Sequence, residues 1–401
     1  MSKLLQILNK YLNFNYSFNF FLLLWVVSIP FKNIFYQSST ILLILIFVTY
    51  IIKNKDFNYI KQIILLHKDI TFAFLLILAS MTVSNFINDV SATNAWHLEF
   101  SYIYRYALIL LILFYFYSKD FFDKNLLITF ILVSLGLQVF GGVCQELIGH
   151  DIFGNEKGDL NGWRGVVFNR NVFGLLMGFG ILISFLIIRF YSKINFKSSI
   201  LSIFLFLFII ATLFSYSRAV WVSLVITAII FIICNFKNFN KFDLVYFLII
   251  IVIGIIVFFN VDSLQNRFIA LVNANPSHRD EIWWQSFELF KQKLFFGWGL
   301  NAWSVHGLKE YANVHNSILE ILVSLGIFGF ISFSYFLYLV FSEIKRSKNL
   351  NAFYLLIFVI TDTQFDQSIV SSKILLSCIV ILIFYIYCDR NYNKFTKEIV
   401  K

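Results

Sequence analysis

Three arginines stand at predicted helix starts, where physical chemistry opposes a positive charge. They are Arg170 in FNRNVFG, Arg218 in FSYSRAVW and Arg279 in NPSHRDEIWW. A helix start carries partial positive charge and stabilises anions, so a cation there is favoured only when an anion joins it. Loops translocated across a membrane also tend to be poor in Lys and Arg. The three positions therefore predict a site for a phosphate-bearing ligand.

Arg218 and Arg279 are the pair that we expect to hold a diphosphate. Two forked guanidinium groups can grip it bidentately without a metal ion. A plainer interpretation of Arg218 is an interfacial side chain that reaches to water. For Arg279 the plainer interpretation is pairing with Asp280 or Glu281. The residue types alone leave both interpretations open.

His315 in YANVHNSILE stands where the chain re-enters the membrane. Imidazole is the side chain best suited to accept a proton near neutral pH, so His315 is the candidate base. The adjacent Asn316 is a candidate for substrate binding. A lone histidine at an interface is more often structural, and this alternative stays open.

Further polar candidates lie near other helix ends, and they are Arg164, Asn169, Arg170, Asn171, Asp362 and Asp366. The two arginines among them are candidates for phosphate or sugar contacts, and Asn169 is a candidate for substrate binding. Asparagine caps helix starts well, so either asparagine also fits a purely structural role. The two aspartates, in TDTQFDQS, are candidates for binding sugar hydroxyls, although surface solvation is the plainer account.

The elements that must position these residues are membrane helices. The 401 residues are 59% hydrophobic and 20% aromatic, and only 13% are charged. A membrane-spanning helix needs about 20 largely apolar residues. We predict an all-α polytopic membrane protein with twelve spans, roughly at 15–32, 35–52, 70–87, 102–118, 126–148, 171–189, 198–214, 218–235, 243–260, 315–342, 352–368 and 370–388.

The positions of Lys and Arg predict the orientation in the membrane. If the amino terminus is cytoplasmic, every predicted inside segment holds at least two Lys or Arg, as the positive-inside rule requires. Both termini are then cytoplasmic, and the three arginines face the outside. The net charge of +10 reflects this bias and attraction to anionic membrane lipids. No basic stripe lies in a soluble domain, so nucleic-acid binding is not expected.

Domain organisation looks simple, with a single transmembrane domain over 1–401. One large external loop, 261–314, lies between spans nine and ten. Within it we expect a helix capped by Ser277, with Trp283, Phe287 and Phe290 on one apolar face. The four cysteines are scattered without a C-x-x-C pattern, so neither a protein-held metal nor a cofactor is expected.

Three motifs in order resemble the O-antigen ligase and polymerase superfamily of bacterial membrane glycosyltransferases, over roughly 165–335. SYSRAVW is similar to the family's Ser-Arg-small-small-Trp signature. HRDEIWWQSFELFKQKLFFGWGLNAW is similar to its external Arg…Trp…Gly-x-Gly segment. VHNSILEILVSLGIFGF, with Gly326 and Gly329, resembles its re-entry helix. NRNVFG is similar to an Asn-x-Asn motif that often carries Pro in the middle, so Arg170 departs from the pattern.

The resemblance implies a GT-C-like helical fold and a metal-independent reaction at the periplasmic face of the bacterial inner membrane. The donor would be a glycan linked to undecaprenyl diphosphate, and the acceptor lipid A–core. Arg218 and Arg279 would hold the diphosphate while His315 assists the acceptor hydroxyl. A ligase is favoured over a polymerase because only one external loop is large. A transporter of lipid-linked saccharides is the alternative from another class, although such proteins usually place ionisable groups deep within their spans.

Overall fold

Long apolar runs form the helices of this protein, as their composition predicts. A computed structural model describes residues 14–88, 90, 94–158, 162–167, 169–190, 196–273, 278–308, 310–311, 313–366, 369–370 and 372–388. In this part of the chain, 8 helices are long and apolar enough to cross a membrane, and shorter apolar helices accompany them. The same residues form no strand beyond an isolated bridge between His150 and Glu156. The all-α polytopic prediction is confirmed, whereas the count of twelve spans stays a prediction.

The helix bounds follow the predicted apolar segments closely. The long elements are α3 (Asn33–Asn54), α5 (Lys68–Ile87), α6 with η1 and α7 (Ala95–Tyr102, Ile103–Ala107 and Leu108–Ser118), α8 (Lys124–Ile148), α9 (Arg170–Phe190), α11 (Arg218–Asn235), α12 (Lys241–Asn260) and α16 (Ser317–Ser347). The shorter apolar helices are α2 (Phe14–Ser28), α10 (Phe196–Phe214), α17 (Leu350–Asp362) and α18 (Lys373–Tyr387). The more polar connections contain α4 (Phe57–Leu66), η3 (Phe236–Asn238), α13 (Asp262–Val272), α14 (Arg279–Gln292) and α15 (Trp303–His306).

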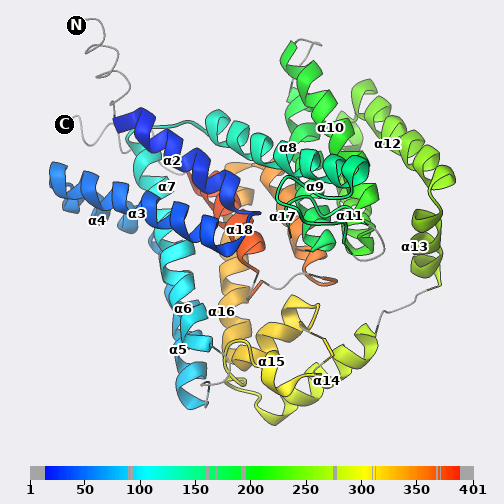
Figure 1. Ribbon diagram of the computed structural model, residues 1–401. Coiled ribbons are helices and arrows are strands. Elements are labelled where there is room, and N and C mark those ends of the chain that lie inside the picture. Colours follow the sequence, from blue (N-terminus) through cyan, green and yellow to red (C-terminus); the bar gives the residue numbers. More distant parts are fainter. Residues whose placement is uncertain are drawn as a thin grey trace, which may run out of the picture. The chain divides into compact units, whose positions relative to one another are not determined.

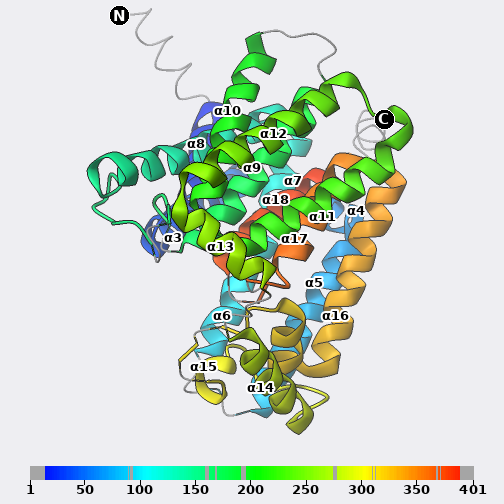
Figure 2. The same cartoon turned by 90° about the vertical axis from the view of Figure 1, so that its right-hand side faces the viewer.

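The chain divides into two compact units, each with helices drawn from distant parts of the sequence. Unit 1 takes the described residues of 1–131, 282–349 and 368–401. In it α5 packs along α16, α2 along α3, and α18 along α7 (Figure 1). Unit 2 takes the described residues of 132–281 and 350–367. In it α9 packs against α10, and α17 packs against both α9 and α11 (Figure 2).

Helix α16 is interrupted at Gly326, which has a φ of 64° and a ψ of −162°. The interruption frees backbone groups, and the segment 294–299 satisfies them. Ile327 N–H donates to the Leu294 carbonyl at 2.8 Å, and Trp298 N–H donates to the Val323 carbonyl at 2.9 Å. Irregular backbone at membrane depth is tolerated only where protein groups replace the missing hydrogen bonds. Backbone hydrogen bonds therefore join the sequences LFFGWG and SLGIFG to each other.

Polar residues of α5 hold the same segment from its other side. The Ser84 hydroxyl donates to the Ser324 carbonyl at 2.7 Å. The Asn85 side chain accepts from Leu300 N–H at 2.9 Å and donates to Glu99 at 2.8 Å. Each buried polar group thus has a partner, which removes the cost of an unsatisfied group. The segment after α14 is consequently fixed between α5 and α16.

The predicted loop 261–314 contains more helix than expected, because α13 was not predicted. Helix α4, between α3 and α5, was not predicted either. The predicted loop helix is present as α14, but its buried face consists of Ile282, Ser286 and Leu289. Trp283 and Phe290 pack against this core, whereas Phe287 is 44% exposed. The buried residues at i, i+4 and i+7 form a face next to the predicted apolar one. The predicted cap Ser277 lies outside the described residues.

Substitution of Gly326 by alanine should destabilise the protein. A Cβ at this position would lie 2.5 Å from the Phe295 backbone, and the left-handed φ alone costs about 1–3 kcal/mol for other residues. Gly254→Ala in α12 is the matched control, because a Cβ there meets nothing within 4 Å. Thermal unfolding of the purified protein in detergent should show a lower Tm for the first variant only. Equal Tm values would mean that α16 is not interrupted as described.

Candidate anion-binding site

Four arginines of unit 2 lie close enough to influence one another electrostatically. Three of them are the first residues of their helices, namely Arg170 of α9, Arg218 of α11 and Arg279 of α14. The fourth, Arg267, lies in α13. Arg218 is exposed to the charges of Arg267 and Arg279, and Arg267 to those of Arg170 and Arg279. We call these four residues the arginine cluster.

Arg218 is buried, with 8% of its surface exposed. Its Nη1 donates to the carbonyl of Ala270, near the end of α13, at 3.1 Å. Ser217 precedes it in extended backbone and makes no side-chain cap hydrogen bond to the helix. The interpretation of a solvated interfacial side chain is therefore wrong, because the guanidinium packs under α13 instead of reaching to water. The positive helix start and the buried guanidinium together favour an anion.

Arg279 faces two aspartates at the end of α17. Its Nη2 lies 4.0 Å from Oδ1 of Asp366, which follows the helix. Pairing with Asp280 or Glu281 is not what forms; Glu281 instead lies 3.8 Å from His278. The tertiary fold supplies Asp366 from a segment 87 residues away in sequence, and no local pattern could indicate this partner.

The two aspartates are buried, so the expectation of surface solvation was wrong. Asp362 is 1% exposed and Asp366 is 4% exposed. Asp366 accepts a hydrogen bond from the Asn171 side chain at 2.9 Å. Neither carboxylate oxygen of Asp362 has a hydrogen-bond partner in the described part of the chain. A buried carboxyl group without a partner is costly, which is typical of a functional site.

Arg170 is tied to the turn that precedes α11. Its Nη1 donates to the carbonyls of Ser215 and Tyr216 at 3.2 and 3.0 Å. Asn169 accepts from Asn171 N–H at 2.7 Å and so caps α9. The structural alternative for Asn169 thus has direct support, whereas its contact with a substrate stays a prediction. Arg170 therefore connects the start of α9 to the turn just before α11.

Arg267 is the member that the motifs did not reveal. Its Nε is buried and has no hydrogen-bond partner in the described residues. The signal that could have found it is the amphipathic pattern of 262–272, in which Leu264 is buried and the neighbouring positions are polar. Because α13 was not recognised as a helix, Arg267 was not placed on any face.

The electrostatics of the cluster show that its positive charge is only partly compensated. Burial lowers the pKa of Arg267, and the charges of Arg170 and Arg279 lower it further. Burial also lowers the pKa of Arg279, while Asp366 and Asp362 oppose that change. All four guanidinium groups remain charged at neutral pH, because arginine titrates far above it. Among the described residues, four guanidinium groups meet two carboxyl groups here, and this ratio suits a di- or trivalent anion.

Three predicted site residues are not members of the arginine cluster. Arg164 donates from Nε to the Glu156 carbonyl at 2.5 Å, and its side chain lies beside Gly158, as does that of Arg170. His315 and Asn316 belong to unit 1. Asn316 caps α16 by accepting from Leu319 N–H at 3.0 Å, and His315 precedes it with a left-handed φ of 54°. Their part in any chemistry stays a prediction.

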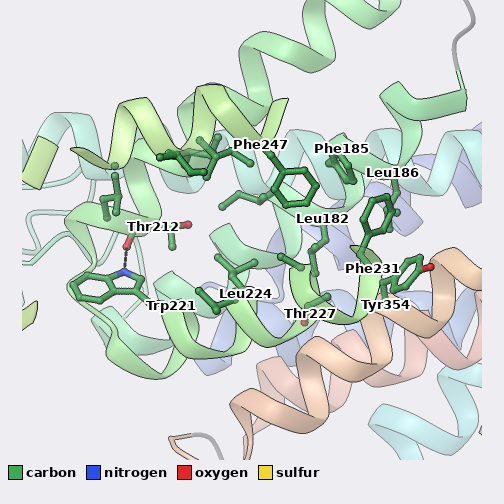
Figure 3. Close-up of a pocket in the computed structure, with 18 residues that line it drawn as sticks. Leu182, Phe185, Leu186, Thr212, Trp221, Leu224, Thr227, Phe231, Phe247 and Tyr354 are labelled. Atoms are coloured by element: carbon green, nitrogen blue, oxygen red, sulfur yellow. Dashed lines mark hydrogen bonds between the residues drawn. The ribbon is translucent and has the colours of Figure 1, made fainter. Parts of the chain in front are cut away.

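An apolar cavity of about 340 Å³ lies within unit 2, between α9, α10, α11, α12 and α17. Figure 3 shows Trp221 and Thr212 at one end of it and Phe231 and Tyr354 at the other. The few hydroxyl groups in its lining already have partners, such as Thr227, which donates to the Ser223 carbonyl at 2.7 Å. The cavity therefore suits a hydrocarbon chain and offers nothing to a polar ligand.

The described residues contain no group of three His, Cys, Asp or Glu side chains arranged to hold a metal ion. The described residues form a polytopic helical membrane protein in which three helix-start arginines and Arg267 are grouped in unit 2. Residues 203–334 match the family model described as O-antigen ligase, and no curated protein matched the sequence. This match supports the resemblance to the O-antigen ligase superfamily that the motifs predict. The matched stretch, about a third of the chain, contains Arg218, Arg267, Arg279 and His315.

Pyrophosphate should bind the arginine cluster and raise the Tm of the purified protein. Arg267→Gln should weaken this binding about tenfold or more, because it removes a charge-assisted interaction from a partly buried site. Lys291→Gln is the control and should retain the full effect, because Lys291 is exposed and pairs with Glu288 at 2.6 Å. The Tm of each variant, measured at increasing pyrophosphate concentrations, gives the strength of binding. An unchanged response of Arg267→Gln, or equal losses in the two variants, would contradict the assignment.

Proposed function

We propose that this protein is an O-antigen ligase-type glycosyltransferase. The resemblance to the superfamily implies a glycosyltransferase-like enzyme that uses a lipid-linked glycan and a lipid acceptor. The proposed donor is a glycan on undecaprenyl diphosphate, and the proposed acceptor is lipid A–core at the periplasmic face of the inner membrane. The observation that carries the proposal is the arginine cluster of unit 2, where four guanidinium groups meet two carboxyl groups among the described residues.

The cluster supports the diphosphate part of the proposal. During transfer, negative charge builds on the departing diphosphate as its bond to the anomeric carbon breaks. Guanidinium groups that are already in place stabilise this charge without reorganisation, which accelerates the chemical step. Arg218 and Arg279 are the residues to which we give this role, and Arg267 and Arg170 add to the same field. The reaction then needs neither a nucleotide nor a metal ion.

The apolar cavity supports the lipid part. Trp221 in its lining comes three residues after Arg218 in α11, a rise of about 5 Å. The lining continues along the same helix to Phe231, about 15 Å further on. A diphosphate at Arg218 would thus have an apolar channel beginning one helical turn below it. This is the arrangement that a polyprenyl diphosphate requires (Figure 3).

The acceptor sugar hydroxyl is the nucleophile in the proposed mechanism. Its oxygen attacks the anomeric carbon of the donor, the carbon–oxygen bond to the diphosphate breaks, and the hydroxyl proton passes to His315. Direct displacement inverts the anomeric centre. His315 precedes the first turn of α16 and is half-buried, so its imidazole is held by a defined backbone.

Arg218→Ala and Arg279→Ala should each abolish transfer by purified protein supplied with lipid-linked glycan and lipid A–core in the presence of EDTA. Each removes a charge that stabilises the leaving diphosphate. Lys291→Gln is the control, because Lys291 is exposed and pairs with Glu288 at 2.6 Å. The product should be glycan covalently attached to lipid A–core. Extension of the lipid-linked glycan instead would identify a polymerase, and movement across vesicles without transfer would identify a transporter.

His315→Asn should lower kcat by about 100-fold or more while changing the KM for the donor little, because a base acts on the chemical step. Asparagine is the matched replacement, since it tolerates the left-handed backbone of this position better than most residues. Steady-state kinetics of transfer measure the two constants separately. A variant with wild-type kcat would exclude His315 as the base.

A further inference from the structure

Unit 1 contains a second pair of buried cations, which the proposed reaction does not use. Arg105 lies in the π-helical segment η1 and is 7% exposed. Lys373 is the first residue of α18. The Cζ atom of Arg105 lies 5.8 Å from the centroid of the Tyr36 ring, and Nζ of Lys373 lies 5.6 Å from the same centroid. Ionisable groups inside a helical membrane protein are costly and usually mark a functional site.

The hydrogen-bond partners of these cations among the described residues are neutral. Arg105 donates from Nε to the Tyr104 hydroxyl at 2.7 Å, and its Cζ lies 5.1 Å from the Tyr104 ring centroid. Lys373 donates to the carbonyl of Phe31. Hydroxyl groups, carbonyls and aromatic rings hold a cation in place but leave its charge uncancelled.

Two observations indicate that this environment would favour an anion. Nη2 of Arg105 is buried and has no hydrogen-bond partner in the described part of the chain. Among the same residues, no carboxylate forms an ion pair with either Arg105 or Lys373. A buried guanidinium with a free donor and a neighbouring ammonium group is expensive unless a negative group completes it.

The local fold holds this arrangement rigidly. The π-helical turn adds one residue to the helix between α6 and α7, which changes the direction in which its side chains point. Tyr102, just before it, donates to the carbonyls of Ile369 and Val370 at 2.9 and 2.8 Å. These bonds tie the start of α18 to η1, and Tyr36 is itself fixed by a 2.8 Å hydrogen bond to Ser377. The two cations are therefore positioned by the backbone and not by each other.

We propose that unit 1 binds a phosphate group at Arg105 and Lys373, in addition to the diphosphate proposed for unit 2. A forked guanidinium, a compact ammonium and tyrosine hydroxyls together suit the tetrahedral oxygens of a phosphate ester. The ester can belong to a membrane lipid headgroup or to a small soluble phosphate, since both present the same chemistry. The proposal does not depend on the transfer reaction.

The test is thermal unfolding of the full-length protein, delipidated in detergent, with phosphatidylglycerol, with diacylglycerol or with inorganic phosphate. Phosphatidylglycerol should raise the Tm by several degrees, and diacylglycerol, which lacks the phosphate, should not. An equal rise with inorganic phosphate that Arg105→Gln removes identifies a soluble ligand, and the absence of such a rise identifies a lipid headgroup. A protein that responds to none of the phosphates overturns the proposal.

Arg105→Gln should abolish the rise while leaving the Tm without anion unchanged or higher, because it removes an uncompensated buried charge. Lys373→Met makes the same test if the first variant does not fold. Arg279→Gln, in unit 2, is the matched control and should keep the rise. A merely structural role for Arg105 predicts the opposite pattern, with a lower Tm in every condition and an undiminished rise, and that result overturns the proposal. None of these Tm measurements depends on transfer activity.

Discussion

Positive charge withdrawn from water near the starts of helices is the constraint on which the rest of unit 2 depends. Arg218 is almost fully buried, and among the described residues the arginine cluster combines four guanidinium groups with two carboxyl groups. Burying such charges is costly, so the surrounding fold must hold their partners in place. The carbonyls of Ser215, Tyr216 and Ala270 accept from Arg170 and Arg218, so the backbone itself holds the cations in place.

The interruption of α16 has the corresponding role in unit 1. Gly326 opens the helix, and the segment 294–299 closes the gap with its own backbone groups. This exchange fixes the chain that follows α14 and the start of α16, where Asn316 caps the helix and His315 precedes it. A helix cap, a broken helix and an inserted segment thus determine where the imidazole is presented. Glycine is needed at positions 297 and 326 because only a residue without a Cβ fits such a close backbone approach.

Much of this organisation could be predicted from local patterns. Apolar runs indicated every long helix, and the arginines at 170, 218 and 279 were correctly placed at helix starts, because both signals depend on neighbouring residues. The partners of those arginines were predicted wrongly or missed. Asp366 reaches Arg279 from a distant segment, and Arg267 was overlooked because α13 is short and its apolar face is narrow. The buried face of α14, formed by Ile282, Ser286 and Leu289, was not foreseen because the pattern of this helix offers two adjacent faces for packing.

The sequence by itself determined the class of protein, the helices and the residue types at their ends, since hydrophobic length and helix-start chemistry are local properties. Only the tertiary structure decided which charges meet. Burial of Asp362 and Asp366, the grouping of Arg267 with three helix-start arginines, and the cations around Tyr36 all arise from packing between distant segments. Electrostatic partnership depends on separation in space and on exclusion of water, and neither is written in the order of residues along the chain.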